Sequence, residues 1–252
     1  VSILNKIIFL FCFMINKNIS VVTVTFNDNE GLMKTLSSLS MLKVLPREVI
    51  VVDGGSLGFD ANGILEKFSN SLPQLIITSE PDLGIYDAMN KGKRKCLGAL
   101  IHYLNSGDIV EGDPYHNLKV ESLLPVKFLD EKGVECGNDR VKFFGTAYNH
   151  QGIIFNKYHS PFNINYQIAS DYVSILQSFP EGLKNLPISK HGSVCYSLGG
   201  RSSNKSLYGS LEMVKALILY RPLIAIVMIP IIFIKLLIPR GIRRAFLQIT
   251  KS

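Results

Sequence analysis

The sequence lacks both glycine-rich phosphate motifs that mark the common nucleotide-binding proteins. Neither GxxxxGK[ST] nor GxGxxG occurs among its 252 residues, which excludes a P-loop and a dinucleotide-binding fingerprint. Cysteine is also scarce, since Cys12, Cys96, Cys136 and Cys195 lie far apart and form no CxxC pair. A disulfide scaffold and a zinc site are therefore disfavoured, and a reducing compartment is expected.

Charged residues make up only 19% of the chain and hydrophobic residues 47%, with a mean hydropathy of +0.22. The formal net charge of +7 nevertheless favours an anionic partner. Four basic residues follow a strongly apolar C-terminal segment, namely Arg240, Arg243, Arg244 and Lys251. This pattern indicates an anionic membrane surface. No basic, aromatic-rich motif of the RNA-binding type occurs, so a nucleic-acid partner is not expected.

Both ends of the chain are apolar. Residues 7–15 resemble the core of a signal peptide, but polar residues 16–18 follow without a small-residue cleavage site. Residues 1–18 are therefore interpreted as an apolar lead-in, an N-terminal segment that is not cleaved and touches a membrane. Residues 222–239 are apolar but contain Pro230 and Lys235. A spanning helix needs about 20 apolar residues, so an interfacial or re-entrant helix is preferred to a span, and a span to a buried core helix.

The segment between residues 19 and 108 alternates apolar strands with amphipathic helices. Strands are predicted at residues 19–27, 48–56, 75–82 and 98–108, and helices at residues 30–42, 63–71 and 84–96. Leu32, Leu36 and Leu39 have the spacing of one buried helix face, and Pro46 is expected to break the chain before the second strand. Such alternation predicts an α/β fold with a mostly parallel central sheet flanked by helices.

Every predicted strand ends in polar residues. These ends are residues 25–27, 53–55, 80–82 and 105–108. Ligands of parallel α/β sheets bind beyond the carboxyl ends of the strands, and although one polar end is ordinary turn chemistry, four together indicate a site. The carboxylates would repel a bare phosphate but suit Mg²⁺ or Mn²⁺ carrying a diphosphate.

Several stretches are similar in order and spacing to family 2 glycosyltransferases: VVTVTFNDNEGLMKTLSSL, VIVVDGGS, SEPDLGIYDAMNKG, LNSGD and, downstream, NHQGIIFNK, PFNINYQIASDY and LGGRSSN. The resemblance covers residues 19–204, and SEPDLGIYDAMNKG resembles the bacterial exopolysaccharide and lipopolysaccharide members most specifically. It implies a GT-A domain with a Rossmann-like sheet over residues 19–210. Residues 19–112 would form its nucleotide-sugar half and 113–210 its acceptor half, with residues 211–252 as a membrane-associating tail.

The resemblance also implies residues for the nucleotide-sugar donor. Those bordering the base and ribose would be Thr25, Phe26, Asn27 and Asp53. Those lining the sugar-nucleotide pocket would be Asp82, Asp87, Asn90 and Lys91. Two ordinary structural roles remain open, an Asp-Gly turn at Asp53 and a surface ion pair between Asp87 and Lys91.

NSGD stands in the place of the family's DxD metal motif, with Asn105 and Gly107 where carboxylates often occur. This leaves Asp108 as the expected ligand of Mg²⁺ or Mn²⁺, and Asn105 as a hydrogen-bond partner of the ribose. One carboxylate is sufficient for Mg²⁺ when diphosphate oxygens and water complete the coordination.

Asp171, in IASDY, aligns with the family's catalytic base, which takes the proton of the acceptor hydroxyl in an inverting transfer. A helix N-cap is the structural alternative, because YVSILQSF after it is typical of a helix. His150 and Gln151 resemble the family's acceptor-side pair, and Arg201 a cation for the diphosphate. His191 would assist the metal or diphosphate, or lie in a surface loop.

The expected activity is inverting transfer from a nucleotide-diphosphate sugar to a lipid-linked or oligosaccharide acceptor in cell-surface polysaccharide synthesis. The expected location is the cytoplasmic face of the bacterial inner membrane, with peripheral or C-terminal attachment. A sugar nucleotidyltransferase is disfavoured because TFNDNEG offers no cation to a triphosphate. An inactive membrane-bound scaffold would predict loss of Asp53, Asp108 or Asp171, and all three are present.

Overall fold

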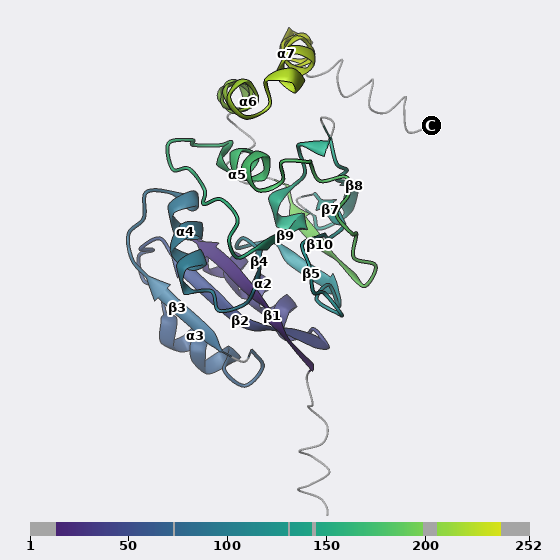
Figure 1. Cartoon of the computed structure of the whole chain (residues 1–252). Coiled ribbons are helices and arrows are strands. Elements are labelled where there is room, and N and C mark those ends of the chain that lie inside the picture. Colours follow the sequence, from purple (N-terminus) through teal and green to yellow (C-terminus); the bar gives the residue numbers. More distant parts are fainter. Residues whose placement is uncertain (1–13, 73, 131, 143–144, 199–205, 238–252) are drawn as a thin grey trace, which may run out of the picture.

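The computed structural model describes residues 14–237 except 73, 131, 143–144 and 199–205. Its first half alternates strands and helices, as the sequence predicts (Figure 1). The elements are β1 (Met14–Thr25), α2 (Asn29–Ser40), β2 (Val44–Asp53), α3 (Ala61–Phe68), β3 (Leu75–Ser79), α4 (Ile85–Lys95) and β4 (Leu100–Tyr103).

The second half, in its described residues, contains shorter strands and three longer helices, two of which follow the last strand. Its strands are β5 (Ile109–Gly112), β6 (Ser122–Leu123), β7 (Val126–Leu129), β8 (Glu135–Asn138), β9 (Ile153–Asn156) and β10 (Gly192–Ser197). Its helical elements are the short η3 (His150–Gly152), α5 (Ser170–Ser178), α6 (Ser206–Tyr220) and α7 (Pro222–Leu237).

The main sheet has the order β3-β2-β1-β4-β9-β6. Its first four strands are parallel, whereas β9 runs antiparallel to both β4 and β6. A second sheet, β5-β10-β7-β8, was not predicted. The expected α/β class with flanking helices is confirmed, but the sheets are mixed, and the parallel part is confined to the first half.

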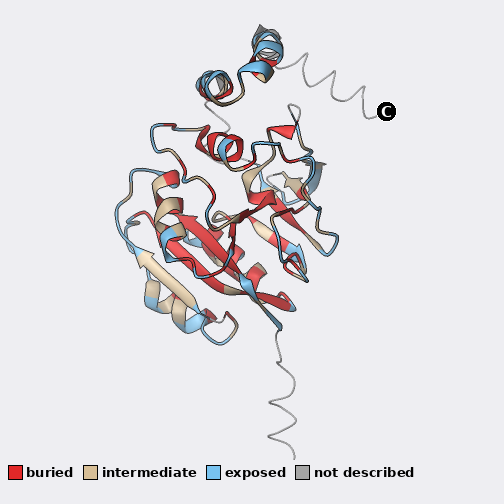
Figure 2. Ribbon diagram, viewed as in Figure 1, coloured by how far each residue is buried: buried red, intermediate tan, exposed pale blue. Residues whose placement is uncertain are grey.

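Helices cover both faces of the parallel strands, and the buried residues concentrate between the layers (Figure 2). On one face, Leu32, Leu36 and Leu39 of α2 are fully buried, as their spacing predicts. On the other, α4 packs through Met89 and Gly92, where an added Cβ would lie 2.4 Å from Val22 Cγ1. The close approach of α4 fixes the position of its N-terminal turn beside the strand ends.

Two details differ from the prediction. The first strand begins at Met14, inside the predicted lead-in, and Pro46 lies within β2 instead of breaking the chain. Pro46 is tolerated because β3 pairs with β2 only from Val49 onward, so the missing N–H has no strand partner on that side. The register of β1 against β2 also shifts between Asn16 and Ser20, close to the proline.

The three C-terminal helices share a small core of their own, which includes Tyr172 and Val173 of α5, Leu217 of α6 and Met228 of α7. Among the described residues, no helix is long and apolar enough to cross a membrane. In α7, Leu223 is 80% exposed and Ile226 is 71% exposed, whereas Ala225 and Met228 are buried, so the described part of this helix is buried on one face only. The rest of the terminal predictions, at residues 1–13 and 238–252, lie outside the described residues.

Candidate active site

A cleft of about 1200 Å³ opens where the carboxyl ends of the parallel strands meet the second half of the chain. Seven of the residues predicted for the site line it: Thr25, Phe26, Asp82, Asp87, Asn105, His150 and Asp171. The first five come from the strand ends and α4, and the last two from η3 and α5. The cleft therefore has one wall from each half of the chain.

The wall from the first half is built around Gly54. An added Cβ at this glycine would lie 2.4 Å from Asp82 Oδ2 and 3.3 Å from Phe26 Cδ2. Asp82 is held in place because its Oδ1 accepts a hydrogen bond of 2.8 Å from the Gly84 amide. The absence of a side chain at Gly54 thus lets an aromatic ring and a carboxylate lie together on the cleft wall.

Other predicted donor residues support this wall from behind. Asp53 is fully buried, and its carboxylate accepts hydrogen bonds from the Gly55 and Ser56 amides and from the Ser56 and Ser79 hydroxyls. Asn27 is exposed in a turn with a positive φ of 52°. Their direct contact with a nucleotide stays a prediction, since neither lines the cleft.

The helix α4 is fixed by polar contacts of the SEPDLGIYDAMNKG stretch. Asn90 uses both ends of its amide on one residue, because Nδ2 donates to the Phe162 carbonyl at 2.7 Å and Oδ1 accepts from the Phe162 amide at 2.9 Å. Lys91 pairs with Glu80 at 3.3 Å and with Asp87 at 3.5 Å. The i,i+4 ion pair foreseen for Asp87 and Lys91 is therefore present, and donor contacts of Asn90 and Lys91 stay predictions.

Asp108 lies behind the cleft with its carboxylate hydrogen-bonded on both oxygens. Oδ2 accepts from Gln151 Nε2 at 2.7 Å, and Oδ1 accepts from the Ser197 amide at 2.8 Å. Burial raises the pKa of Asp108 to about 6, and these two hydrogen bonds act in the opposite direction. Each oxygen keeps a second lone pair, so these bonds do not decide whether Asp108 coordinates a metal, and that role stays a prediction.

Two other groups at this end of the cleft offer oxygen to a cation. Asn105 Oδ1 is buried without a hydrogen-bond partner. Asp28, which sequence reasoning missed, also lines the cleft, and its Oδ2 accepts a hydrogen bond of 2.7 Å from Ser106 Oγ. An added Cβ at Gly107 would lie 3.8 Å from Asp28 Oδ2, so the Asp28 carboxylate occupies space near the position where the motif lacks one. Among the described residues, no group of three or more histidine, cysteine or acidic side chains could hold a metal alone. The residues fit Mg²⁺ or Mn²⁺ only together with substrate phosphate oxygens.

Asp171 stands in the first turn of α5 and faces the cleft. Its Oδ2 lies 3.1 Å from His150 Nδ1, and its Oδ1 accepts a hydrogen bond of 3.3 Å from Tyr86 Oη. Its Oδ1 also accepts from the amide of Tyr172 at 2.8 Å, although the N-cap position belongs to Ala169. Tyr86 comes from α4 and was missed by sequence reasoning, because its spacing reads as an ordinary buried helix position.

The loop before Asp171 is held by α6. The buried Glu212 carboxylate accepts three backbone hydrogen bonds, from the amides of Gln167, Ile168 and Ala169, at 2.8 to 2.9 Å. This carboxylate therefore positions the start of α5, and with it the Asp171 side chain. No sequence pattern indicated this role, since the contact joins residues 43 to 45 positions apart.

The remaining predicted residues lie elsewhere. Gln151 is fully buried, and its Oε1 accepts a hydrogen bond from the Asn105 amide, so it joins η3 to the end of β4. His191 is exposed and packs edge-on against His116 at a ring distance of 4.7 Å, as the surface-loop alternative predicts. Arg201 lies outside the described residues.

Comparison with known proteins identifies the family. Residues 20–168 match the model of glycosyl transferase family 2, and the chain belongs to this family. An uncharacterized glycosyltransferase of Mycobacterium tuberculosis is 37% identical over 131 residues, which cover 49% of this chain and 48% of the relative. The chain thus spans about half the length of the curated relatives it matches.

Solved structures resemble the fold. S. aureus TarS residues 1–349 in complex with UDP-GlcNAc superposes with a TM-score of 0.57 at 15% identity, over 81% of this chain and 67% of that TarS fragment. The mannosyltransferase PcManGT from Pyrobaculum calidifontis, in complex with GDP-Man and Mn²⁺, gives a TM-score of 0.56 at 14% identity, over 79% of this chain and 62% of the other. These similarities establish a GT-A-like α/β fold.

Proposed function

We propose that the chain is an inverting glycosyltransferase that moves a sugar from a nucleotide-diphosphate donor to a hydroxyl group of a glycan acceptor. The observation that carries the proposal is the position of Asp171, which faces the cleft opposite the wall of Phe26, Gly54 and Asp82. Membership of glycosyl transferase family 2 supports the same reaction.

In this reaction Asp171 accepts the proton of the acceptor hydroxyl while the hydroxyl oxygen bonds to the anomeric carbon of the donor sugar. The bond from that carbon to the diphosphate oxygen breaks, and the nucleoside diphosphate leaves from the opposite face. A single displacement of this kind inverts the configuration of the anomeric carbon. The hydrogen bonds of Tyr86 and the contact of His150 with Asp171 hold the carboxylate in one orientation.

The donor is proposed to lie along the wall from the first half, and solved structures of similar fold hold UDP-GlcNAc, in TarS, and GDP-Man, in PcManGT. Asp28 and Asn105 are the residues that would hold Mg²⁺ or Mn²⁺ together with the diphosphate, and Asp108 is the ligand predicted from the NSGD motif. When bound, such a cation neutralises the charge of the departing diphosphate.

The acceptor is proposed to be lipid-linked, in cell-surface polysaccharide synthesis at the cytoplasmic face of the bacterial inner membrane. Support comes from α6 and α7, which expose the apolar side chains Leu211, Ile218, Leu219, Leu223, Ile226 and Val227. Basic residues follow these helices in the sequence, which favours an anionic lipid surface.

The decisive experiment is the Asp171→Asn variant with UDP- and GDP-sugars, a membrane extract as acceptor source, and Mn²⁺. Transfer should fall at least about a hundredfold, because general-base catalysis contributes about 10²–10⁴. Nucleotide binding should persist, because Asn keeps the shape of the side chain. Asp60→Asn is a matched control, since Asp60 caps α3 away from the cleft and Asn caps helices equally well. Near-normal transfer by Asp171→Asn would reject the assignment of the base.

A further inference from the structure

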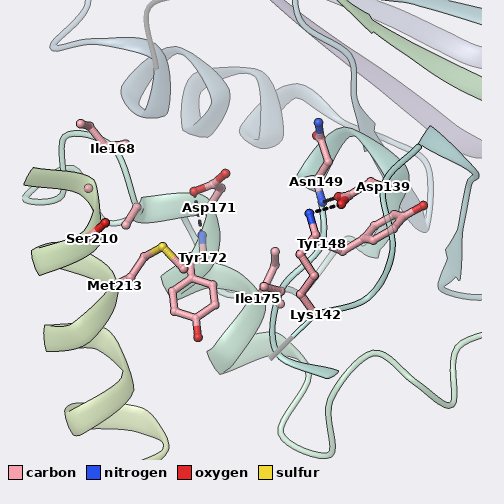
Figure 3. A pocket seen from close by; sticks show the side chains of 13 residues that line it. Asp139, Lys142, Tyr148, Asn149, Ile168, Asp171, Tyr172, Ile175, Ser210 and Met213 are labelled. Atoms are coloured by element: carbon pink, nitrogen blue, oxygen red, sulfur yellow. Dashed lines mark hydrogen bonds and ion pairs between the residues drawn. The ribbon is translucent and has the colours of Figure 1, made fainter. Parts of the chain in front are cut away.

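A second, smaller pocket of about 390 Å³ lies on the α6 side of Asp171 (Figure 3). Four residues line both this pocket and the main cleft: Asp139, Asn149, Ile168 and Asp171. The two spaces therefore meet at the proposed base. Met213 and Ser210 of α6 form one side of the pocket, and Lys142, Tyr148 and Asn149 form the opposite side.

The lining combines apolar surface with a fixed polar edge. Met213 and Ile168 offer apolar contact, and the ring of Tyr172 lies next to Met213 in Figure 3. On the other side, Asp139 accepts a hydrogen bond of 2.7 Å from the Asn149 amide and also pairs with Lys142. Its carboxylate also accepts a hydrogen bond of 2.9 Å from the Arg140 amide, and only 4% of the side chain is exposed, so these contacts hold it in one orientation. Sugars present the same combination, with C–H faces between rims of hydroxyl groups.

The charges of the pocket favour a neutral ligand over a phosphate. Asp139 and Asp171 are both acidic, and the ammonium group of Lys142 is already paired with Asp139. A nucleoside diphosphate here would face the Asp171 carboxylate, and among the described lining residues no cation other than the paired Lys142 could offset its charge. Hydroxyl groups, by contrast, donate hydrogen bonds to carboxylates.

The position of the pocket also matches the stereochemistry of displacement. An inverting transfer requires the attacking hydroxyl and the leaving diphosphate on opposite faces of the anomeric carbon. The cleft wall assigned to the donor lies on one side of Asp171, and this pocket opens beside Asp171 toward α6. A hydroxyl group held in the pocket would meet the base without crossing the donor.

The geometry points to this pocket as the acceptor subsite, which binds the neutral sugar whose hydroxyl group Asp171 deprotonates. This inference rests on the proposed function and adds to it the residues that recognise the acceptor. Asp139 accepts hydrogen bonds from the hydroxyl groups of that sugar, and Met213 packs against its C–H face. Because Met213 belongs to α6, the acceptor sugar is bound next to the helices proposed to contact lipid.

The test uses the full chain and the methyl glycosides of glucose, galactose, mannose and N-acetylglucosamine, with UDP or GDP and Mn²⁺ present. Saturation-transfer NMR should detect at least one glycoside on the wild-type protein. Met213→Trp, which fills the pocket, should weaken that binding at least about tenfold, a usual effect of steric mismatch in a pocket. Binding of UDP or GDP, measured by calorimetry, should not change.

Leu211→Trp is the matched control, because it adds the same bulk to the same helix at a side chain that is 50% exposed. Asp139→Asn is the second variant, since it keeps the size of the side chain while removing the charge. It should also weaken glycoside binding while nucleotide binding persists. Wild-type glycoside binding in Met213→Trp, or nucleotide binding without any glycoside signal in the wild type, would overturn the subsite. Failure of the wild type to bind either nucleotide would instead contradict the proposed function.

Discussion

Tyr86 Oη shares its single proton between two acceptors, Asp171 Oδ1 at 3.3 Å and the Ile168 carbonyl oxygen. Tyr86 belongs to α4, which follows the third strand, whereas Asp171 and Ile168 belong to the second half of the chain. A single phenol group therefore joins the wall assigned to the donor to the carboxylate proposed as the base.

We predict that Tyr86→Phe lowers kcat about tenfold without changing the KM for the donor, because Asp171 loses one of the groups that orient it. The ring itself should stay in place, since it stacks on Phe162 at 5.7 Å. Loss of a buried hydrogen bond should also cost about 1–3 kcal/mol of unfolding free energy. Steady-state kinetics and urea denaturation measure the two effects. Tyr158→Phe, at a side chain that is 90% exposed, should change neither.

We predict that Gly54→Ala weakens nucleotide binding, because the new methyl group would displace the Asp82 carboxylate from the cleft wall. The fold should persist, since the displaced atoms are the end of a flexible side chain. Calorimetric titration with UDP and GDP measures the change. Gly137→Ala is a suitable control, because its nearest neighbour would be Phe128 Cδ2 at an ordinary 3.8 Å. Equal affinities in the two variants would refute the role given to this wall.

Asp28→Asn and Asp108→Asn should have different effects on metal dependence. Asn caps α2 as well as Asp does, so the Asp28→Asn variant should fold normally. Adding Mn²⁺ should raise its nucleotide affinity by a factor that is about ten times smaller, or smaller still, than the factor for the wild type. Asp108→Asn should instead lower the Tm without metal, because one of its two buried hydrogen bonds is lost, at about 1–3 kcal/mol. An Asp108 variant of normal Tm that no longer responds to Mn²⁺ would make Asp108 the ligand, as its motif predicts.

The stability of the fold should fall on acidification because His102 is buried in its neutral form. Burial lowers its pKa from 6.5 to about 4, while its two ring nitrogens contact Tyr115 Oη and the Gln151 carbonyl. Below about pH 6.5 the unfolded chain takes up the proton first, so this contribution to stability is lost as the pH falls toward 4. The slope is about 1.4 kcal/mol per pH unit for one such group.

The unfolding free energy of His102→Gln, measured by urea denaturation, should fall less steeply between pH 6 and pH 4 than that of the wild type, by about 1.4 kcal/mol per pH unit. This difference in slope is expected whatever the effect of the substitution at neutral pH. His191→Gln, at an exposed ring, provides the comparison. A slope in His102→Gln identical to that of the wild type would mean that His102 does not stay neutral in the fold.

Leu223→Glu should weaken binding to vesicles of phosphatidylglycerol and phosphatidylethanolamine about tenfold or more. Withdrawing one leucine from an apolar phase costs about 1.5–3 kcal/mol, and each 1.4 kcal/mol is a factor of ten. Leu57→Glu is the control, because Leu57 is 96% exposed but lies in the turn before α3. If vesicle flotation gives the same bound fraction for Leu223→Glu and Leu57→Glu, the lipid contact does not lie on this surface of α7.

The alternating half of the fold could be predicted because each strand and helix there carries its own pattern. Leu32, Leu36 and Leu39 are buried as their spacing requires, and the polar strand ends do gather at one edge. The second sheet could not be predicted, since its strands are short and pair over long distances. Cys195 of β10, for example, lies opposite Ile109 of β5.

The candidate site was predictable by position along the chain but not by the direction of each side chain. Asp53, Asn90 and Gln151 occur at the expected places, yet their polar groups hydrogen-bond to neighbouring turns and loops. Polar residues at strand ends can either stabilise a turn or contact a ligand, and the linear sequence pattern does not distinguish these two roles. Glu212 and Asp139 were not predicted as site residues. Glu212 contacts residues 167–169, which lie far from it in the sequence, and the residues around Asp139 form no recognisable motif.

The three hydrogen bonds of Glu212 have a practical consequence for protein engineering. Removing both apolar C-terminal helices would be the usual way to obtain a soluble enzyme for crystallisation or screening. Here that truncation would also remove the anchor of residues 167–169 and loosen the carboxylate that follows them. Solubility is better sought by polar replacements on the outer surface of α7, at side chains such as Leu223 and Ile226, with the helix left in place.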